Sequence, residues 1–101
     1  MNKIPSRLMV GPKWFTVEHP KIMYKYGCMG SVNYDIRVIN VASHSSRTGK
    51  RFTQAQQENT FWHELTHAIL NDMGSPLCED ERFVTLFADR LTKAIRTARF
   101  K

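Results

Sequence analysis

The pattern of hydrophobic and polar residues predicts short strands in the first half of the chain. Residues 13–18 (KWFTVE) predict a strand that ends before Pro20, because proline cannot donate a hydrogen bond to a neighbouring strand. Residues 22–29 (IMYKYGCM) form a possible second strand. Residues 32–41 (VNYDIRVINV) are rich in β-branched side chains and alternate in part, so they give the strongest strand prediction.

After residue 52 the pattern becomes helical. Residues 43–51 (SHSSRTGKR) have the composition of a loop, and Thr53 then precedes Gln56 at the spacing of a capping box. Gly74 and the proline two residues later give a stop signal. The apolar residues that recur between them at helical spacing are Phe61, Leu65, Ala68 and Ile69. We therefore expect one helix over residues 54–73.

A last helix is predicted to begin at Asp80, which is a suitable N-cap. Its predicted apolar stripe consists of Phe83, Val84, Phe87, Leu91 and Ile95. Basic residues recur near its C-terminal end, at Arg90, Lys93, Arg96 and Arg99. Their position suits the helix dipole, and we expect a solvated face there rather than a contact with nucleic acid.

Size and charge limit the classes of protein that the chain can form. Its 101 residues fit one domain, residues 1–101, and no apolar run approaches the about 18 residues of a membrane span. Residues 1–52 contain nine lysines and arginines against two acidic residues, whereas residues 53–101 contain six against seven. Such a bias can attract nucleic acid or an acidic partner protein, although it also keeps a small protein in solution.

The two cysteines, Cys28 and Cys78, form neither a CxxC pair nor the spacing of a zinc ribbon. We expect two free thiols, as in a protein of a reducing compartment. The first fifteen residues lack the apolar run and cleavage site of a secretion signal. These features together predict a cytoplasmic protein.

The predicted helix 54–73 contains the sequence HELTH at residues 63–67. His63 and His67 are four residues apart, so both imidazoles can point at one metal ion. Glu64 is rotated by about 100° from His63, which makes it a poor third ligand but allows it to reach a water molecule on the metal. Two ligands and one general base are the physical content of the H-E-x-x-H motif, and zinc suits the imidazole ligands.

A catalytic zinc site needs a third protein ligand. The donors upstream of the motif are His19, Cys28 and His44. Downstream there is no histidine, and Asp72, five residues past His67, points elsewhere on the helix. Glu81 begins an inward-facing row of the last helix, so we expect it to be the third ligand. Asp80 would be occupied as N-cap and Glu79 would lie outside the helix, but both remain alternatives.

The sequences HELTHAIL and EDERFVTLFADRL resemble those of small zincin metallopeptidases of the gluzincin kind. They are most similar to the minimal ImmA/IrrE-type and phage-encoded neutral zinc peptidase domains. The segments KIPSRLMVG, KWFTVE and YDIRVINV are similar in order to that pattern, so the resemblance extends over nearly the whole chain. It is specific at HELTH, moderate at Glu81 and loose elsewhere.

This resemblance implies a zincin-like α+β fold, in which a small twisted antiparallel or mixed sheet packs on an active-site helix beside a C-terminal helix. It implies a zinc-dependent metallopeptidase with His63, His67 and Glu81 as ligands and Glu64 as general base. Its substrate would be a protein or peptide in extended conformation, paired with an edge strand of the sheet. Residues 32–41 are the expected edge strand.

The sequence departs from the family pattern at Thr85, where larger gluzincins place an aspartate that supports a histidine ligand. The residue that stabilises the oxyanion is not matched either, and Tyr34 and His44 are the candidates. A different class of function is an alternative: a basic nucleic-acid- or protein-binding module of phage or mobile-element type, with a non-catalytic metal site. A hydrolase of non-peptide substrates is a further alternative.

Overall fold

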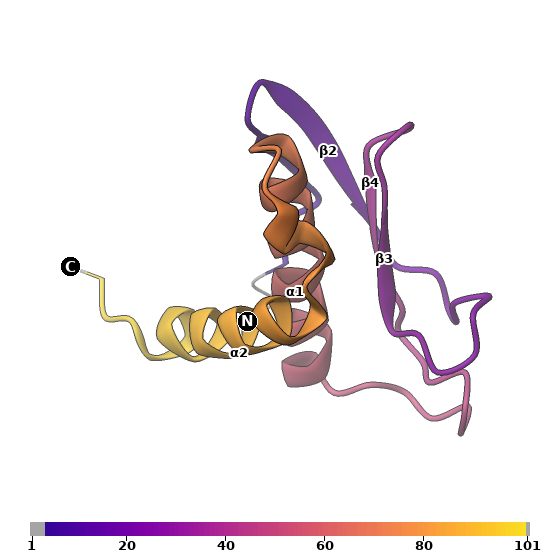
Figure 1. Ribbon diagram of the computed structural model, residues 1–101. Coiled ribbons are helices and arrows are strands. Elements are labelled where there is room, and N and C mark those ends of the chain that lie inside the picture. Colours follow the sequence, from indigo (N-terminus) through magenta and orange to yellow (C-terminus); the bar gives the residue numbers. More distant parts are fainter. Residues whose placement is uncertain (1–3, 101) are drawn as a thin grey trace.

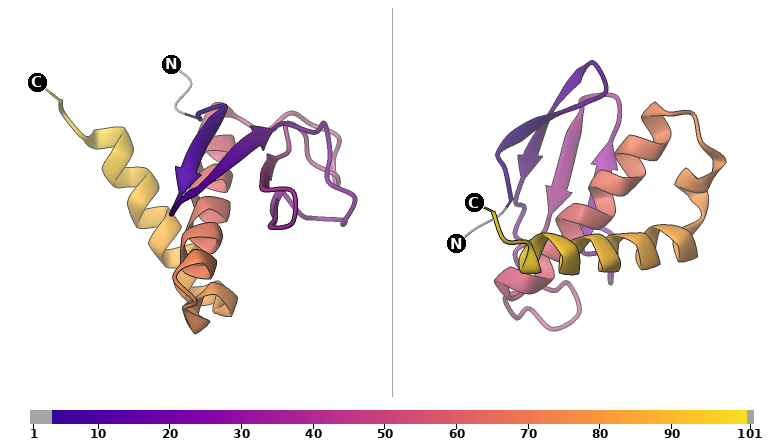
Figure 2. Two further views of the ribbon diagram at one scale, coloured as in Figure 1. Left: turned by 90° about the horizontal axis from the view of Figure 1, so that it is seen from above. Right: turned by 90° about the vertical axis from the view of Figure 1, so that its left-hand side faces the viewer.

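The computed structural model describes residues 4–100, which form a four-stranded sheet with helices on one of its faces (Figure 1). Strands β1 (Arg7–Val10) and β2 (Lys13–Glu18) form a hairpin, and β3 (Gly30–Asn33) and β4 (Val38–Val41) form another. Helix α1 (Gln54–Asp72), the short 3-10 helix η1 (Pro76–Glu79) and helix α2 (Glu81–Thr97) follow. Helix α1 lies between the sheet and α2 (Figures 1 and 2).

The sheet has the order β1-β2-β4-β3 and is mixed. Neighbours β1 and β2 are antiparallel, as are β3 and β4, whereas β2 and β4 run parallel. This arrangement makes β3 one edge of the sheet. The coarse prediction of an α+β fold with a mixed sheet and a C-terminal helix is confirmed, and β2 coincides with the strand predicted over residues 13–18.

The strand predicted over residues 22–29 was wrong, and the one predicted over residues 32–41 was wrong in part. Residues 22–29 contain turns and bends instead of a strand, and Gly27 adopts a left-handed conformation with φ of 79° that interrupts an extended run. Residues 32–41 are not one strand, because the side chain of Asn33 accepts hydrogen bonds from the backbone N–H groups of Asp35 and Ile36 and so begins a turn. The turn ends at Arg37, whose φ is 57°.

The core lies between the sheet and α1. It consists of Val10, Phe15, Val17, Ile39, Val41, Phe61, Leu65 and Ala68. Phe61, Ile39 and Val41 are completely buried. The core residues of α1, which include Leu65 from the HELTH motif itself, lie on the face opposite to His63 and His67, so burial of that face directs the two histidines away from the core.

Local signals in the sequence set the bounds of α1. The Thr53 side chain accepts a hydrogen bond from the backbone of Gln56, whose side chain accepts one from the backbone of Thr53. This capping box confirms the predicted start. Gly74 has a φ of 68°, a left-handed conformation that glycine adopts without strain, and the helix ends just before it.

Helix α2 packs on α1 and η1 rather than on the sheet. Asp80 is its N-cap and accepts a hydrogen bond from the backbone of Phe83. The buried row is Val84, Ala88 and Thr92, so the predicted apolar stripe was wrong at Phe87, which is 47% exposed and stacks on Phe83. The basic row is not wholly solvated, since Arg96 pairs with the buried Glu58 of α1.

Within residues 4–100, the helices are too short or too polar to cross a lipid bilayer.

Candidate metal centre

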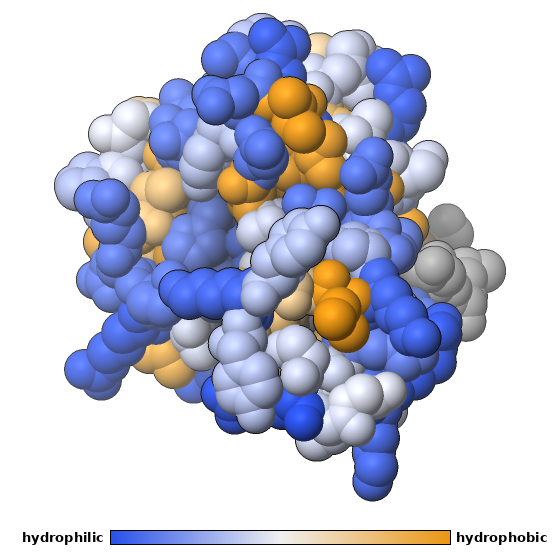
Figure 3. Space-filling model, turned by 90° about the vertical axis from the view of Figure 1, so that its right-hand side faces the viewer, coloured by the Kyte–Doolittle hydropathy of each residue, from blue (hydrophilic) through white to orange (hydrophobic). Residues whose placement is uncertain are grey.

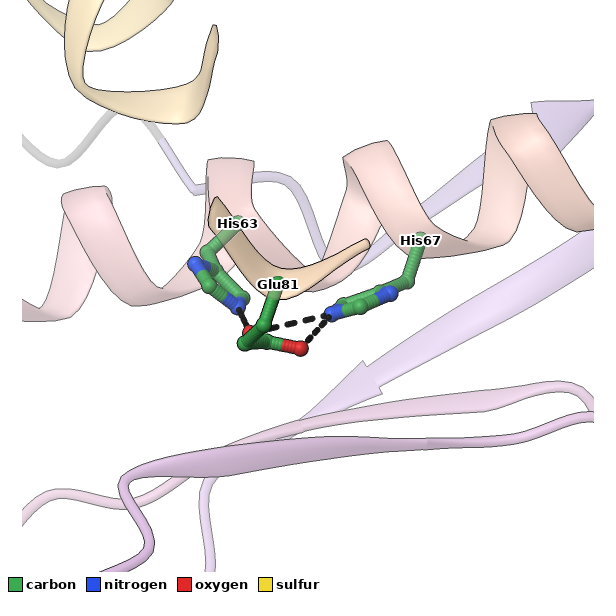
Figure 4. A group of neighbouring side chains, drawn as sticks. All are labelled: His63, His67 and Glu81. Atoms are coloured by element: carbon green, nitrogen blue, oxygen red, sulfur yellow. Dashed lines mark hydrogen bonds and ion pairs between the residues drawn. The ribbon is translucent and has the colours of Figure 1, made fainter. Parts of the chain in front are cut away.

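Three side chains that could bind a metal meet at the start of α2: His63, His67 and Glu81 (Figure 4). One donor atom from each lies within 4.8 Å of the other two. His63 Nε2 is 2.6 Å from Glu81 Oε1, and His67 Nε2 is 3.2 Å from Glu81 Oε2. Over the described part of the chain, this is the only such group of three histidine, cysteine or acidic side chains.

Two helices hold these residues in place. His63 and His67 stand one turn apart on α1, with ring centroids 5.1 Å from each other. Glu81 is the first residue of α2 and begins the row that continues through the buried Val84 and Ala88. The row of α2 that packs on α1 therefore places the Glu81 carboxylate opposite both imidazoles.

The structure separates Glu81 from the other acidic residues downstream of His67. Asp80 is engaged as the N-cap of α2 through the backbone of Phe83. Glu79 lies in η1 and lines a different pocket beside His67. Asp72 is the last residue of α1 and lies next to Gly11 in the β1–β2 turn. Glu81 alone among these acids joins the two histidines.

The donor set fits a zinc ion. Tetrahedral zinc takes imidazole nitrogen and carboxylate oxygen at about 2.0–2.2 Å, so two of its donors lie about 3.4 Å apart. The distances of 2.6 and 3.2 Å from Glu81 to the histidines are both shorter than that separation, so the side chains would have to move apart by less than about 1 Å to admit the ion. Three protein ligands also leave a fourth position for water or substrate, as in catalytic sites.

The orientation of the His67 ring is set from behind by η1. His67 Nδ1 lies 2.7 Å from the carbonyl oxygen of Cys78 and donates to it, because a carbonyl can only accept. This hydrogen bond keeps the proton on Nδ1 and leaves Nε2 as a ligand atom. The thiol of Cys78 in turn donates to the carbonyl of His67. The sequence could not indicate this support, since it comes from a backbone carbonyl.

Glu64 lies beside the three residues, on the side of α1 that faces β3. Its burial raises its pKa to about 7, with Glu81 adding to the rise and His67 opposing it. Gly30 of β3 approaches so closely that an added Cβ would lie 3.1 Å from Cγ of Glu64. A carboxyl group with a pKa near neutrality is suited to accept and return a proton.

Pockets lie on both sides of the three residues. On the His63 side, a pocket of about 260 Å³ is lined by Met29, Gly30, His63, Glu64 and Glu81, among others. On the His67 side, a second pocket is lined by Tyr34, His67, Ser75 and Glu79, among others. The edge strand β3 begins in the first pocket, and Tyr34, just after its end, lines the second.

The remaining candidates from the sequence divide into near and distant residues. The Tyr34 hydroxyl is 3.7 Å from Cys78 Sγ, and burial together with this contact raises the pKa of Tyr34, so its phenol stays protonated. His44 instead contacts Ser43 in the loop before α1 and is not part of the group formed by His63, His67 and Glu81. His19 lies against the carbonyl of Val41. Cys28, a free thiol like Cys78, lines the pocket on the His63 side but donates to Gly30.

Comparison of the chain with protein-family models, with curated proteins and with solved structures gave no match.

Proposed function

We propose that the protein is a zinc-dependent peptidase in which His63, His67 and Glu81 hold the metal and Glu64 is the general base. The observation that carries the proposal is the meeting of two imidazoles and one carboxylate from two helices, with a second, partly buried carboxyl group beside them. A bound zinc ion would supply Lewis acidity, polarising a carbonyl and lowering the pKa of water toward ~7.

The chain's own residues would move the proton. Glu64 takes it from the attacking water and passes it to the leaving nitrogen. Its pKa of about 7 matches a reaction near neutral pH. The hydrogen bond to Cys78 holds His67 in the tautomer that the metal requires. Tyr34 is a protonated donor near the site and is our candidate for stabilising the oxyanion.

Substrate would bind in extended form along β3. This strand is an edge of the sheet and begins in the pocket that contains His63 and Glu64. An extended peptide added to such an edge gains backbone hydrogen bonds without a deep specificity pocket. The two free thiols suit a reducing compartment, so we place the activity in the cytoplasm.

The first test is zinc content, measured by mass spectrometry on purified wild type and three variants. We expect one zinc per chain in wild type and in Glu64→Gln, and little zinc in Glu81→Ala. Glu79→Ala is the matched control, because it removes a neighbouring acid that does not contact the histidines, and it should keep its zinc. Equal zinc in Glu81→Ala and Glu79→Ala would contradict the ligand assignment.

Turnover of a quenched fluorescent peptide library then tests the chemistry. Glu64→Gln should lose roughly 10²–10⁴-fold in kcat while retaining zinc, because general acid–base catalysis contributes about that much. Full activity in this variant would refute the assignment of Glu64 as base. A zinc-loaded wild type that cleaves no peptide in the library would contradict the peptidase proposal.

A further inference from the structure

Two loops at one end of the sheet are joined into a single surface, which we call the paired loops and define as residues 19–29 and 43–52. The backbone of Ser43 donates to the carbonyl of Pro20, and that of His44 donates to Lys21 at 2.8 Å. The backbone of Gly27 donates to the hydroxyl of Ser46, also at 2.8 Å. Figures 1 and 2 show these segments side by side, on the opposite side of the molecule from the C-terminal end of α2.

The paired loops bring together basic residues that come from two separate segments of the sequence. Their charged residues are all basic and exposed: Lys21, Lys25, Arg47, Lys50 and Arg51. The ion pairs formed within residues 4–100 involve none of these five side chains. The charge is therefore directed to the solvent and available to an anionic partner.

Aromatic rings stand among these charges. Tyr24 is fully exposed and Tyr26 is 72% exposed, which is unusual for side chains that can bury so much apolar area. The guanidinium of Arg47 lies 5.8 Å from the centre of the Tyr26 ring. Figure 3 views the molecule from the side on which the paired loops lie in Figure 1, and its hydrophilic side chains project around separate apolar patches.

A pocket of about 360 Å³ lies between the paired loops. Ser45, Ser46 and Arg47 give it polar groups, and Met29 and Phe52 give it apolar ones. A pocket of this size, with both polar and apolar side chains in its wall, suits a small planar group with polar edges, such as a nucleic-acid base. The pocket shares Gly27, Cys28 and Met29 with the pocket beside His63 and Glu64, so the two are adjacent.

We propose that the paired loops bind single-stranded nucleic acid. Lysine and arginine side chains would contact phosphates, and the exposed tyrosine rings would stack on bases that are not paired. A duplex offers the same phosphates but keeps its bases stacked inside, so the tyrosines favour a single strand. An acidic peptide would complement the lysine and arginine charges but would leave the exposed tyrosine rings with nothing to stack on. The proposal is independent of the peptidase function.

Fluorescence anisotropy of a labelled dT20 oligonucleotide tests the proposal with the full chain. Binding should weaken steeply as salt rises from 50 to 200 mM, and a duplex of equal length should bind more weakly. Tyr24→Ala should reduce affinity at least about fivefold, as expected from the loss of one stacked base. Because the Tyr24 side chain lies wholly in solvent, its removal should leave the fold intact.

Two double variants that remove the same charge distinguish binding at the paired loops from a general attraction between the basic protein and the nucleic acid. Lys25→Ala/Lys50→Ala should weaken binding and reduce the slope of log K against log salt by about 1.4, the loss of two single-strand phosphate contacts. Arg90→Ala/Lys93→Ala removes the same charge from α2 and should leave both quantities nearly unchanged. Equal losses in the two double variants, or wild-type affinity in Tyr24→Ala, would overturn the proposal. Tighter binding of labelled polyglutamate than of dT20 would also overturn it, in favour of an acidic protein partner.

Discussion

At the scale of single residues, His63 and Glu64 are neighbours in the sequence but have different surroundings, because the helix turns successive side chains about 100° around its axis. His63 faces Glu81 while Glu64 faces the start of β3. The pKa of about 7 for Glu64 belongs to the metal-free protein. A cation held next to this carboxyl group would favour its charged form, which is the form a general base needs.

Tyr34 provides a prediction at this scale. Tyr34→Phe should lower kcat by about 10²-fold, because one hydrogen-bond donor to an oxyanion typically contributes that much. KM and zinc content should change little, since Tyr34 is not among the three proposed metal ligands. Steady-state kinetics on a peptide found in the library screen would measure both constants.

The control for this prediction is Tyr26→Phe, which removes a hydroxyl from an exposed tyrosine of the paired loops. Its kcat should equal that of wild type. A raised KM with unchanged kcat in Tyr34→Phe would assign Tyr34 to peptide binding instead of oxyanion stabilisation.

At the scale of elements, the short helix η1 links the two halves of the candidate site. Its residue Cys78 accepts the hydrogen bond from His67, and the N-cap Asp80 that starts α2 follows two residues later. The side chain of Ser75 caps η1 by accepting from the backbone of Leu77. The connection between the helices therefore sets both the tautomer of His67 and the position of Glu81, two of the proposed ligands.

The close approach of β3 to α1 depends on glycine at position 30. A Cβ there would lie 2.7 Å from both the Asn40 carbonyl oxygen and Thr60 Cγ2. Gly30→Ala should therefore destabilise the fold by about 1–3 kcal/mol, as overpacking does, and lower kcat by moving β3 away from Glu64. Urea denaturation and peptide turnover would measure the two effects.

A second substitution distinguishes crowding from other effects of Gly30→Ala. Thr60→Ser removes the methyl group that the new Cβ would meet, so the double variant should recover part of the lost stability. Wild-type stability in Gly30→Ala alone would show that a Cβ at position 30 does not crowd Asn40 and Thr60.

The packing of α2 on α1 includes an ion pair between the exposed Arg96 and the buried Glu58. Arg96 Nε lies 3.3 Å from Glu58 Oε1, and Arg96 also donates to the Ala55 carbonyl at 2.7 Å. Arg96→Ala should cost about 2 kcal/mol of unfolding free energy. This is less than the ~3–5 kcal/mol of a fully buried pair, because the Arg96 side chain is 40% exposed.

Arg90→Ala is the control for this prediction. Arg90 is an exposed residue of the same helix and takes no part in the ion pairs formed within the described residues, so its loss should change stability by less than about 0.5 kcal/mol. Urea denaturation at pH 7 would compare the two variants. Equal stability of both would contradict a stabilising role for the pair.

At the scale of the whole molecule, the candidate metal site connects α2 to the rest of the fold. Zinc at about 100 times its Kd would add about 2.7 kcal/mol to the folded state. For a domain of this size the gain corresponds to a rise in Tm of about 10–20 °C. Differential scanning fluorimetry with zinc and after treatment with EDTA would measure it.

Magnesium should leave Tm unchanged in the same experiment, because it prefers oxygen ligands to imidazole. Zinc should also have little effect on Glu81→Ala. A zinc-induced rise of the same size in Glu81→Ala would show that the ion binds elsewhere on the chain.

The helices were predictable from the sequence because their signals are local. The capping box at Thr53, the N-cap at Asp80 and the inward row behind Glu81 all depend on residues within a turn or two. The sheet was less predictable: β1 was not anticipated, and residues 19–29 pair with a loop more than fifteen positions away. The exposure of Phe87 likewise depends on how α2 is rotated against α1, which is a tertiary effect.

The open edge of β3 has a consequence for self-association. A free strand edge can pair with the same edge of another copy, which is a common route to aggregation. Here the edge strand is only four residues long and ends in the turn that begins at Asn33, so a second copy finds few bonds to form. The net charge of +6 adds mutual repulsion between copies. The short, charged chain thus resists pairing with itself and leaves the edge of β3 open for the extended peptide proposed as its substrate.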